Sequence, residues 1–170
     1  MNTHDVAATL GTLFSELVEG APTSGGYILN AGDHGLLRTL DTLPATAASA
    51  PTPTGSSIAA HVDHLRYGLS LMNRWSAGDN PFKDADWSAS WKKTTVTDDE
   101  WRRLRADLRT ETGRWLNALR TPRDVQEIGL NGMIGSIAHL AYHLGAIRQI
   151  NSSLRGPVEV NAPTPLDSRQ

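Results

Sequence analysis

The sequence predicts an all-α protein: a four-helix bundle with one long crossover loop and a short extra helix. Four long stretches repeat apolar residues at the spacing of an amphipathic helix, and no stretch shows the alternation of a half-buried strand. A further stretch of about twenty residues, 76–97, lacks helical periodicity and separates the second and third of them. Long helices with such apolar stripes bury them against one another. The chain length is sufficient for a sizeable core.

The first helix is expected to begin with Thr3 as its N-cap and to stop at Gly20. Its apolar face comprises Val6, Leu10, Leu13, Phe14 and Leu17. Residues 23–33 form a loop rich in glycine and serine, from which three side chains are expected to pack inward: Tyr27, Ile28 and Leu29. Asp33 is the expected cap of a short helix that carries several leucines.

Residues 44–55 form a connector of Ala, Thr, Ser and Pro, after which Ser56 or Ser57 opens the second long helix. That helix is expected to run to about Trp75, with its polar side chains gathered within an arc of about 100°. His61 lies near the centre of the opposite, apolar side, and His64 lies toward its edge.

The long loop 76–97 holds three large aromatic residues, Phe82, Trp87 and Trp91, and loops of this length are commonly functional. A capping box, Thr97-Asp98-Asp99-Glu100, then opens the third long helix. Its buried face comprises Trp101, Leu104, Leu108, Trp115 and Leu119. The fourth long helix is expected over residues 131–152. Residues 1–152 are predicted to form a single domain, and residues 153–170 a disordered polar tail.

The composition excludes several classes of protein. Sixteen Lys and Arg against 18 Asp and Glu give a net charge of −2, which argues against a nucleic-acid-binding protein. There is no cysteine, so any thiol chemistry requires a sulfur from the substrate. The N-terminus lacks the pattern of a signal peptide, so a cytoplasmic location is expected. The uncharged run from Ile128 to Ile147 contains too many Gly, Ser, Asn and His residues for a membrane span and indicates a buried helix.

Two histidines of that uncharged run, His139 and His143, are four residues apart and therefore lie on the same side of the helix. Imidazoles so placed can share a metal ion, and a third could come from His61 or His64. Small residues flank the pair and leave room for a cavity: Gly132, Gly135 and Ala146. The alternative is that these histidines only fill the core. A zinc-protease site is excluded because Leu140 stands where that motif requires Glu.

Four other positions have more than one interpretation. The apolar stripe of the fourth helix is expected to comprise Ile134, Ile137, Ala138, Leu140, Ala141, Leu144 and Ile147. Arg148 falls within this stripe and would need a carboxylate partner. Glu111 falls in the apolar stripe of the third helix, so its carboxylate either points inward or, as expected here, lies at a solvated edge. Trp87 and Trp91 either line the mouth of a pocket or pack over the end of the bundle.

Two segments carry a family resemblance: SIAAHVDHL, from Ser57 to Leu65, and HLAYHLGAI, from His139 to Ile147. Together they resemble the DinB/YfiT-like superfamily over essentially residues 1–152. Its members are four-helix bundles, often dimeric, with a metal site of one His from the second helix and two from an HxxxH in the last. Counting seven residues from the helix-opening Ser57 selects His64, whereas another cap residue would favour a different register.

The resemblance thus implies a metal site formed by His64, His139 and His143, with His61 as a candidate catalytic residue for proton transfer. The ion could be Zn, Ni or Fe, because each accepts imidazole ligands. Such an ion would lower the pKa of a bound water toward ~7 or hold a substrate thiol as thiolate. Many relatives have Gln where this chain has Ala146.

The function implied is a metal-dependent transferase or hydrolase that acts on a small molecule, with a low-molecular-weight thiol such as mycothiol or bacillithiol as co-substrate. The resemblance also implies a homodimer, and the composition described above argues against nucleic acid or a membrane as a partner. Two alternatives stay open at this point. One is a non-catalytic protein that binds a metal or small ligand under stress, and the other is a structural dimeric bundle.

Overall fold

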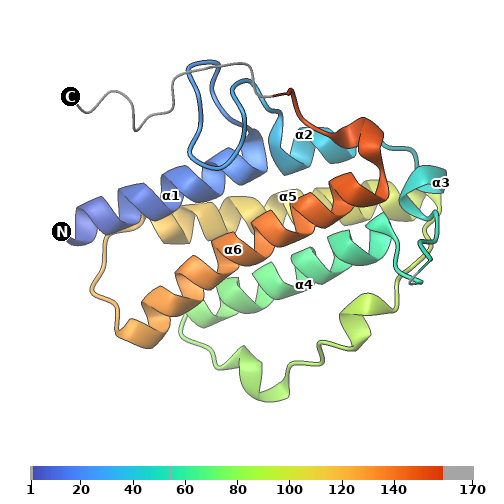
Figure 1. The fold of residues 1–170 in the computed structure, drawn as a ribbon. Helices are drawn as coiled ribbons and strands as arrows, with labels where there is room; N and C mark the ends of the chain where they lie inside the picture. The colour runs from blue at the N-terminus through green and yellow to red at the C-terminus, as the bar shows by residue number, and fades with distance from the viewer. Residues whose placement is uncertain (1, 54, 159–170) are drawn as a thin grey trace. The chain divides into compact units, whose positions relative to one another are not determined.

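The computed structural model describes residues 2–53 and 55–158, and in this part of the chain the protein is all-α, with no strand (Figure 1). Within these ranges the six α-helices are α1 (Thr3–Glu19), α2 (Gly35–Asp41), α3 (Ala45–Ala48), α4 (Ile58–Ser76), α5 (Asp98–Arg120) and α6 (Glu127–Ile150). The same part of the chain contains three short 3-10 helices: η1 (Pro81–Asp84), η2 (Ala89–Trp91) and η3 (Ser152–Leu154). The predicted all-α class is confirmed, and the type of bundle stays a prediction. None of the helices in the described residues combines the length and apolarity that crossing a membrane requires.

The chain forms two compact units. One consists of the residues up to Asp41 together with those from Leu119 onward, and the other of Thr42–Ala118. The prediction of a single domain over residues 1–152 stays a prediction. Of the predicted polar tail, Leu154 is buried at the end of η3, and residues 159–170 lie outside the described part of the chain.

In the first unit, the start of α1 is set by a capping box between Asn2 and Asp5. The Asn2 side chain accepts from the Asp5 amide at 2.9 Å, and the Asp5 carboxylate accepts from the Asn2 amide at 3.4 Å. The predicted cap, Thr3, is therefore wrong by one residue, because the Asn2 side chain reaches the amide three residues on. The helix ends at Gly20, whose φ of 112° favours glycine.

The loop after α1 is organised by the buried carboxylate of Glu16. Its oxygens accept hydrogen bonds from the backbone amides of Tyr27, Ile28 and Leu29 at 2.9, 2.7 and 2.6 Å. Three consecutive amides that face inward turn the adjoining side chains outward, and Tyr27 and Ile28 are 53% and 43% exposed. The predicted inward packing of these two side chains is therefore wrong.

An ion pair joins the start of α2 to the end of α6. The Arg148 guanidinium donates to both carboxylate oxygens of Asp33, at 2.7 and 2.9 Å. The same carboxylate accepts from the amide of Gly35, the first residue of α2, so the predicted cap residue bonds to the start of the helix from two positions before it. Arg148 thus has the carboxylate partner that its place in an apolar stripe demanded.

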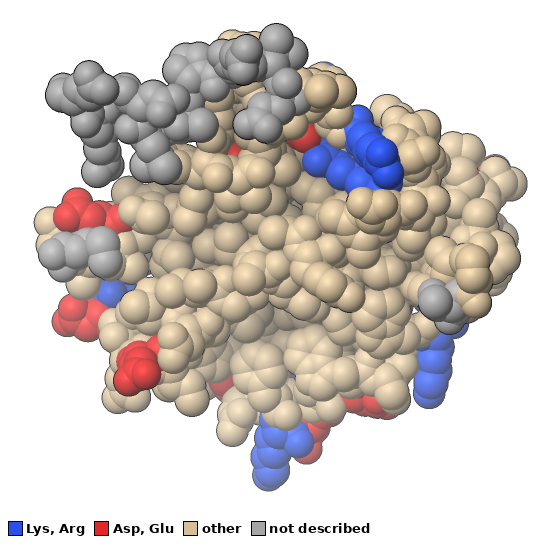
Figure 2. Space-filling model, in the orientation of Figure 1, with Lys and Arg blue, Asp and Glu red and all other residues tan. Residues whose placement is uncertain are grey.

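Helix α6 begins four residues earlier than predicted and buries a narrower face than the sequence suggested. The buried residues on this face are Gly129, Met133, Ile137, Leu140, His143, Leu144 and Ile147. At 100° per residue they define an arc that includes His143 and leaves out Ile134 and Ala138. Ile134 is half exposed and Ala138 is exposed, so their predicted burial is wrong. In Figure 2 the surface along the middle of α6 carries no charged side chain.

In the second unit, local side-chain caps start α4 and α5. Ser57 accepts from the amide of Ala60 and donates to the carbonyl of Thr94, so it is the cap of α4, one of the two predicted. Thr97 and Glu100 form the predicted capping box of α5, in which the Thr97 amide donates to the Glu100 carboxylate at 2.8 Å. Both predicted helix starts are confirmed.

Two polar contacts between different parts of the second unit involve α5. The Trp101 indole donates to the carbonyl of Leu43 at 2.8 Å. The Asn73 amide, from α4, donates to the Glu111 carboxylate at 2.7 Å. Glu111 was expected at a solvated edge, but its side chain is 16% exposed because Asn73 holds it against α4.

The loop 76–97 is not irregular throughout. Its two 3-10 turns, η1 and η2, both contact α4. This loop therefore places aromatic side chains against the helix that carries His61 and His64.

Candidate metal centre

The first part of the candidate site is the pair His139 and His143 on α6. Their Nε2 atoms are 3.0 Å apart, and their ring planes are nearly perpendicular at 86°. His143 is 1% exposed and His139 is half-buried. The spacing of four residues puts both imidazoles on one side of the helix, as predicted.

A nitrogen separation of 3.0 Å suits both a hydrogen bond and a shared ion. Two imidazole nitrogens on one tetrahedral zinc are about 3.4 Å apart, given Zn–N bonds of about 2.0–2.1 Å. A shift of a few tenths of an ångström would thus bring the pair to ligating distance. Burial lowers the pKa of His139 below its ordinary value, which favours the neutral imidazole that a metal requires.

The second part of the site is His64 on α4, which is 7% exposed. Its Nδ1 atom lies 2.8 Å from Oγ of Ser90. The Trp91 ring stacks on the imidazole with centroids 4.4 Å apart, and the Trp87 ring lies 5.7 Å away at a tilt. All three loop residues belong to η2 or the turn before it, so this part of loop 76–97 packs directly on His64.

His61 lies one turn earlier on α4 and is also buried. It meets the same indole from another direction, with its ring edge-on to Trp91 at 5.2 Å. Burial lowers the pKa of His61, so its imidazole is neutral near pH 7. Trp91 thus contacts both histidines of α4.

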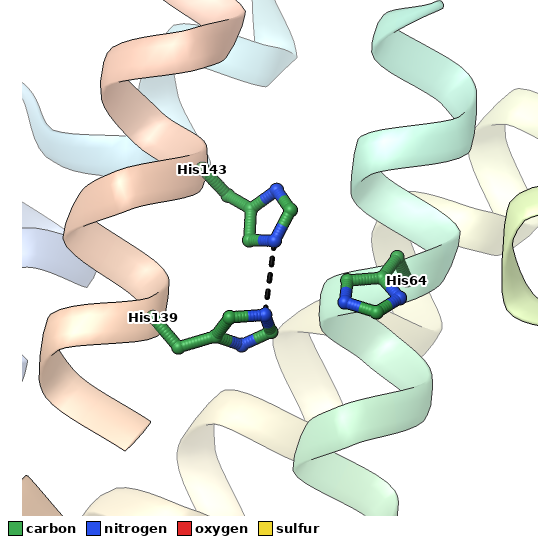
Figure 3. A group of neighbouring side chains, drawn as sticks. All are labelled: His64, His139 and His143. Atoms are coloured by element: carbon green, nitrogen blue, oxygen red, sulfur yellow. Dashed lines mark hydrogen bonds between the residues drawn. The ribbon is translucent and has the colours of Figure 1, made fainter. Parts of the chain in front are cut away.

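Three of these histidines form a group that could hold a metal ion. One ring nitrogen from each of His64, His139 and His143 lies within 4.8 Å of the others, and Figure 3 shows the three rings facing one another. His61 does not belong to the group found in the described residues. Three imidazoles leave at least one position of a tetrahedral ion open to water or substrate. The grouping matches the predicted ligands, and metal binding itself stays a prediction.

Sequence reasoning missed one residue of this region. Ser90 touches His64 through its hydroxyl, but a serine in a loop carries no signal that distinguishes it from its neighbours. Trp87 and Trp91 were candidates for a pocket mouth, and their ring contacts show that they lie beside His64.

Fold and site together define an all-α protein with a buried cluster of three histidines suited to a metal ion. Comparison with protein families, with curated proteins and with solved structures gives no match for this chain.

Proposed function

We propose that this protein binds a divalent metal ion through His64, His139 and His143 and acts with it on a small molecule. The observation that carries the proposal is the approach of three ring nitrogens to within 4.8 Å of one another. An all-imidazole set suits Zn, Ni or Fe, and it leaves the full positive charge of the ion available.

The chemistry follows from the side chains around the site. A bound divalent ion would supply Lewis acidity toward a water or thiol. The Trp91 indole stacks on His64 and covers one face of the imidazole, and the Trp87 indole lies beside the ring. His61, neutral near pH 7 and one turn from His64, would accept a proton from that water or thiol. Because the chain has no cysteine, a thiol would come from a small co-substrate.

The resemblance to the DinB/YfiT-like superfamily supports the same proposal and extends it. It favours a metal-dependent transferase or hydrolase, a low-molecular-weight thiol such as mycothiol or bacillithiol, and a homodimer. We also propose a cytoplasmic location. The resemblance rests on the segments around His64 and from His139 to Ile147.

The test is metal analysis of protein purified without a histidine tag, followed by thiol-transfer and hydrolase assays with the bound metal. We expect about one metal ion per chain and turnover that is lost on chelation. Metal without turnover in any assay would favour a non-catalytic binding protein. A chain that takes up no Zn, Ni or Fe would contradict the proposal and leave a structural helical protein.

A further inference from the structure

The hydroxyl of Ser90 has two polar neighbours, both within the second unit. Its Oγ atom lies 2.7 Å from the carbonyl oxygen of Trp87 and 2.8 Å from Nδ1 of His64. Ser90 is 4% exposed, so water does not compete freely for either bond. The two contacts therefore determine where the protons lie.

A hydroxyl group has one hydrogen to donate, whereas a carbonyl oxygen can only accept. The Ser90 hydrogen must therefore go to Trp87, and the Ser90 oxygen must accept from the ring of His64. This requires a hydrogen on Nδ1 of His64. In a neutral imidazole with a protonated Nδ1, the lone pair is on Nε2.

We propose that Ser90 is a positioning residue that holds His64 in the Nδ1-protonated tautomer and thereby makes Nε2 its metal-binding atom. The part of this inference that concerns the metal rests on the proposed function. The part that concerns the tautomer does not.

The residues around His64 fix the orientation of its ring as well as the position of its proton. Trp91 stacks on the imidazole at an angle of 25°, which restricts the tilt of the ring. Turning the ring over would bring a carbon atom opposite the Ser90 oxygen and leave that buried oxygen without its donor. The loop thus favours one of the two orientations of the imidazole that are related by turning the ring over.

The direct test is long-range ¹H–¹⁵N NMR of the histidine rings in metal-free, full-length protein at about pH 8, where imidazoles are neutral. The His64 signals are assigned by their absence from a His64→Gln spectrum. We expect a protonated Nδ1 and an unprotonated Nε2 in His64. A protonated Nε2 in this residue would overturn the inference.

The second test compares zinc affinities of three variants. Ser90→Ala should weaken zinc binding by about 10–100-fold, as loss of a partner that orients a ligand typically does. It should also make the His64 tautomers a mixture, and Ser90→Thr, which keeps the hydroxyl, should restore both. Ser88→Ala is the matched control, because the Ser88 hydroxyl bonds within the same loop, to Asp86 at 2.6 Å, and makes no hydrogen bond with His64 among the described residues.

The outcomes separate the two proposals. Equal losses of zinc affinity in Ser88→Ala and Ser90→Ala would show a general effect of the loop and overturn the role of Ser90. Wild-type affinity and a wild-type tautomer in Ser90→Ala would do the same. If unsubstituted protein takes up no Zn, Ni or Fe, the proposed function fails, while the tautomer in metal-free protein still decides for or against Ser90. The same NMR measurement decides if circular dichroism shows that Ser90→Ala does not fold.

Discussion

The Nε2 atoms of His139 and His143 lie 3.0 Å apart on one side of α6. Two imidazolium ions could not occupy this arrangement without strong repulsion, so it requires at least one neutral ring. A hydrogen bond satisfies the pair in the absence of metal, and a shared cation satisfies it in the presence of one. The pair is thus compatible with a metal-free folded protein and with a metal-bound one.

Replacement of His143 by Ala should abolish metal uptake, because it removes the most buried of the three proposed ligands. The two imidazoles that remain would bind a metal ion far more weakly than three. The measurement is metal content per chain in tag-free protein after equilibration with zinc and gel filtration. The matched control is His34→Ala, which removes an exposed histidine outside the group. Unchanged stoichiometry in His143→Ala would refute the assignment of this ligand.

The two histidines of α4 should behave differently when each is replaced by Ala. We expect His64→Ala to lose tight zinc binding, since its ring nitrogen belongs to the three-histidine group, and His61→Ala to retain it. If His61 transfers a proton, its variant should bind zinc normally and lose turnover by about 10²–10⁴-fold. Loss of zinc in His61→Ala with retention in His64→Ala would reverse the two roles.

Metal-free protein should become less stable as the pH falls below about 6.5. Burial lowers the pKa values of His61 and His139 from their ordinary value of 6.5, so below that pH the unfolded chain binds more protons than the folded one. The free energy of unfolding then decreases with falling pH until the folded-state pKa values are reached. Well above pH 6.5 both states bind no proton at these groups, and the slope vanishes.

The measurement is urea unfolding in the presence of a chelator, at intervals from pH 8 to pH 5. The double variant His61→Asn, His139→Asn should show a shallower decrease over the same interval, because it removes the two titrating groups. A stability that rises as the pH falls from 6.5 would contradict the assigned directions.

The ion pair between Asp33 and Arg148 should make a measurable contribution to stability. Arg148→Met leaves the Asp33 carboxylate, which is 2% exposed, without its partner, and should lower the free energy of unfolding by about 3 kcal/mol. Adding Asp33→Asn should recover part of this loss, because it removes the unpaired charge. Arg102→Met is the control, since Arg102 and its partner Asp99 are both largely exposed. Equal effects of the two single variants in urea unfolding would contradict the structural role of Arg148.

Short-range chemistry determined the parts of this protein that the sequence predicted well. Ser57 and the Thr97–Glu100 capping box start their helices through bonds to residues three positions away, which a sequence displays directly. The same holds for His139 and His143, whose spacing alone puts them on one side of a helix.

Only the tertiary structure decided features that depend on residues distant in the chain. Glu16 accepts hydrogen bonds from the amides of Tyr27 and Ile28, which are 11 and 12 residues later in the chain, and so turns their side chains outward. Ser90 contacts His64, which is 26 residues earlier. The sequence left His61 and His64 as alternatives because both lie on the less polar side of one helix. Membership of the three-histidine group follows from where distant backbone segments place the rings, and helical periodicity carries no information about that placement.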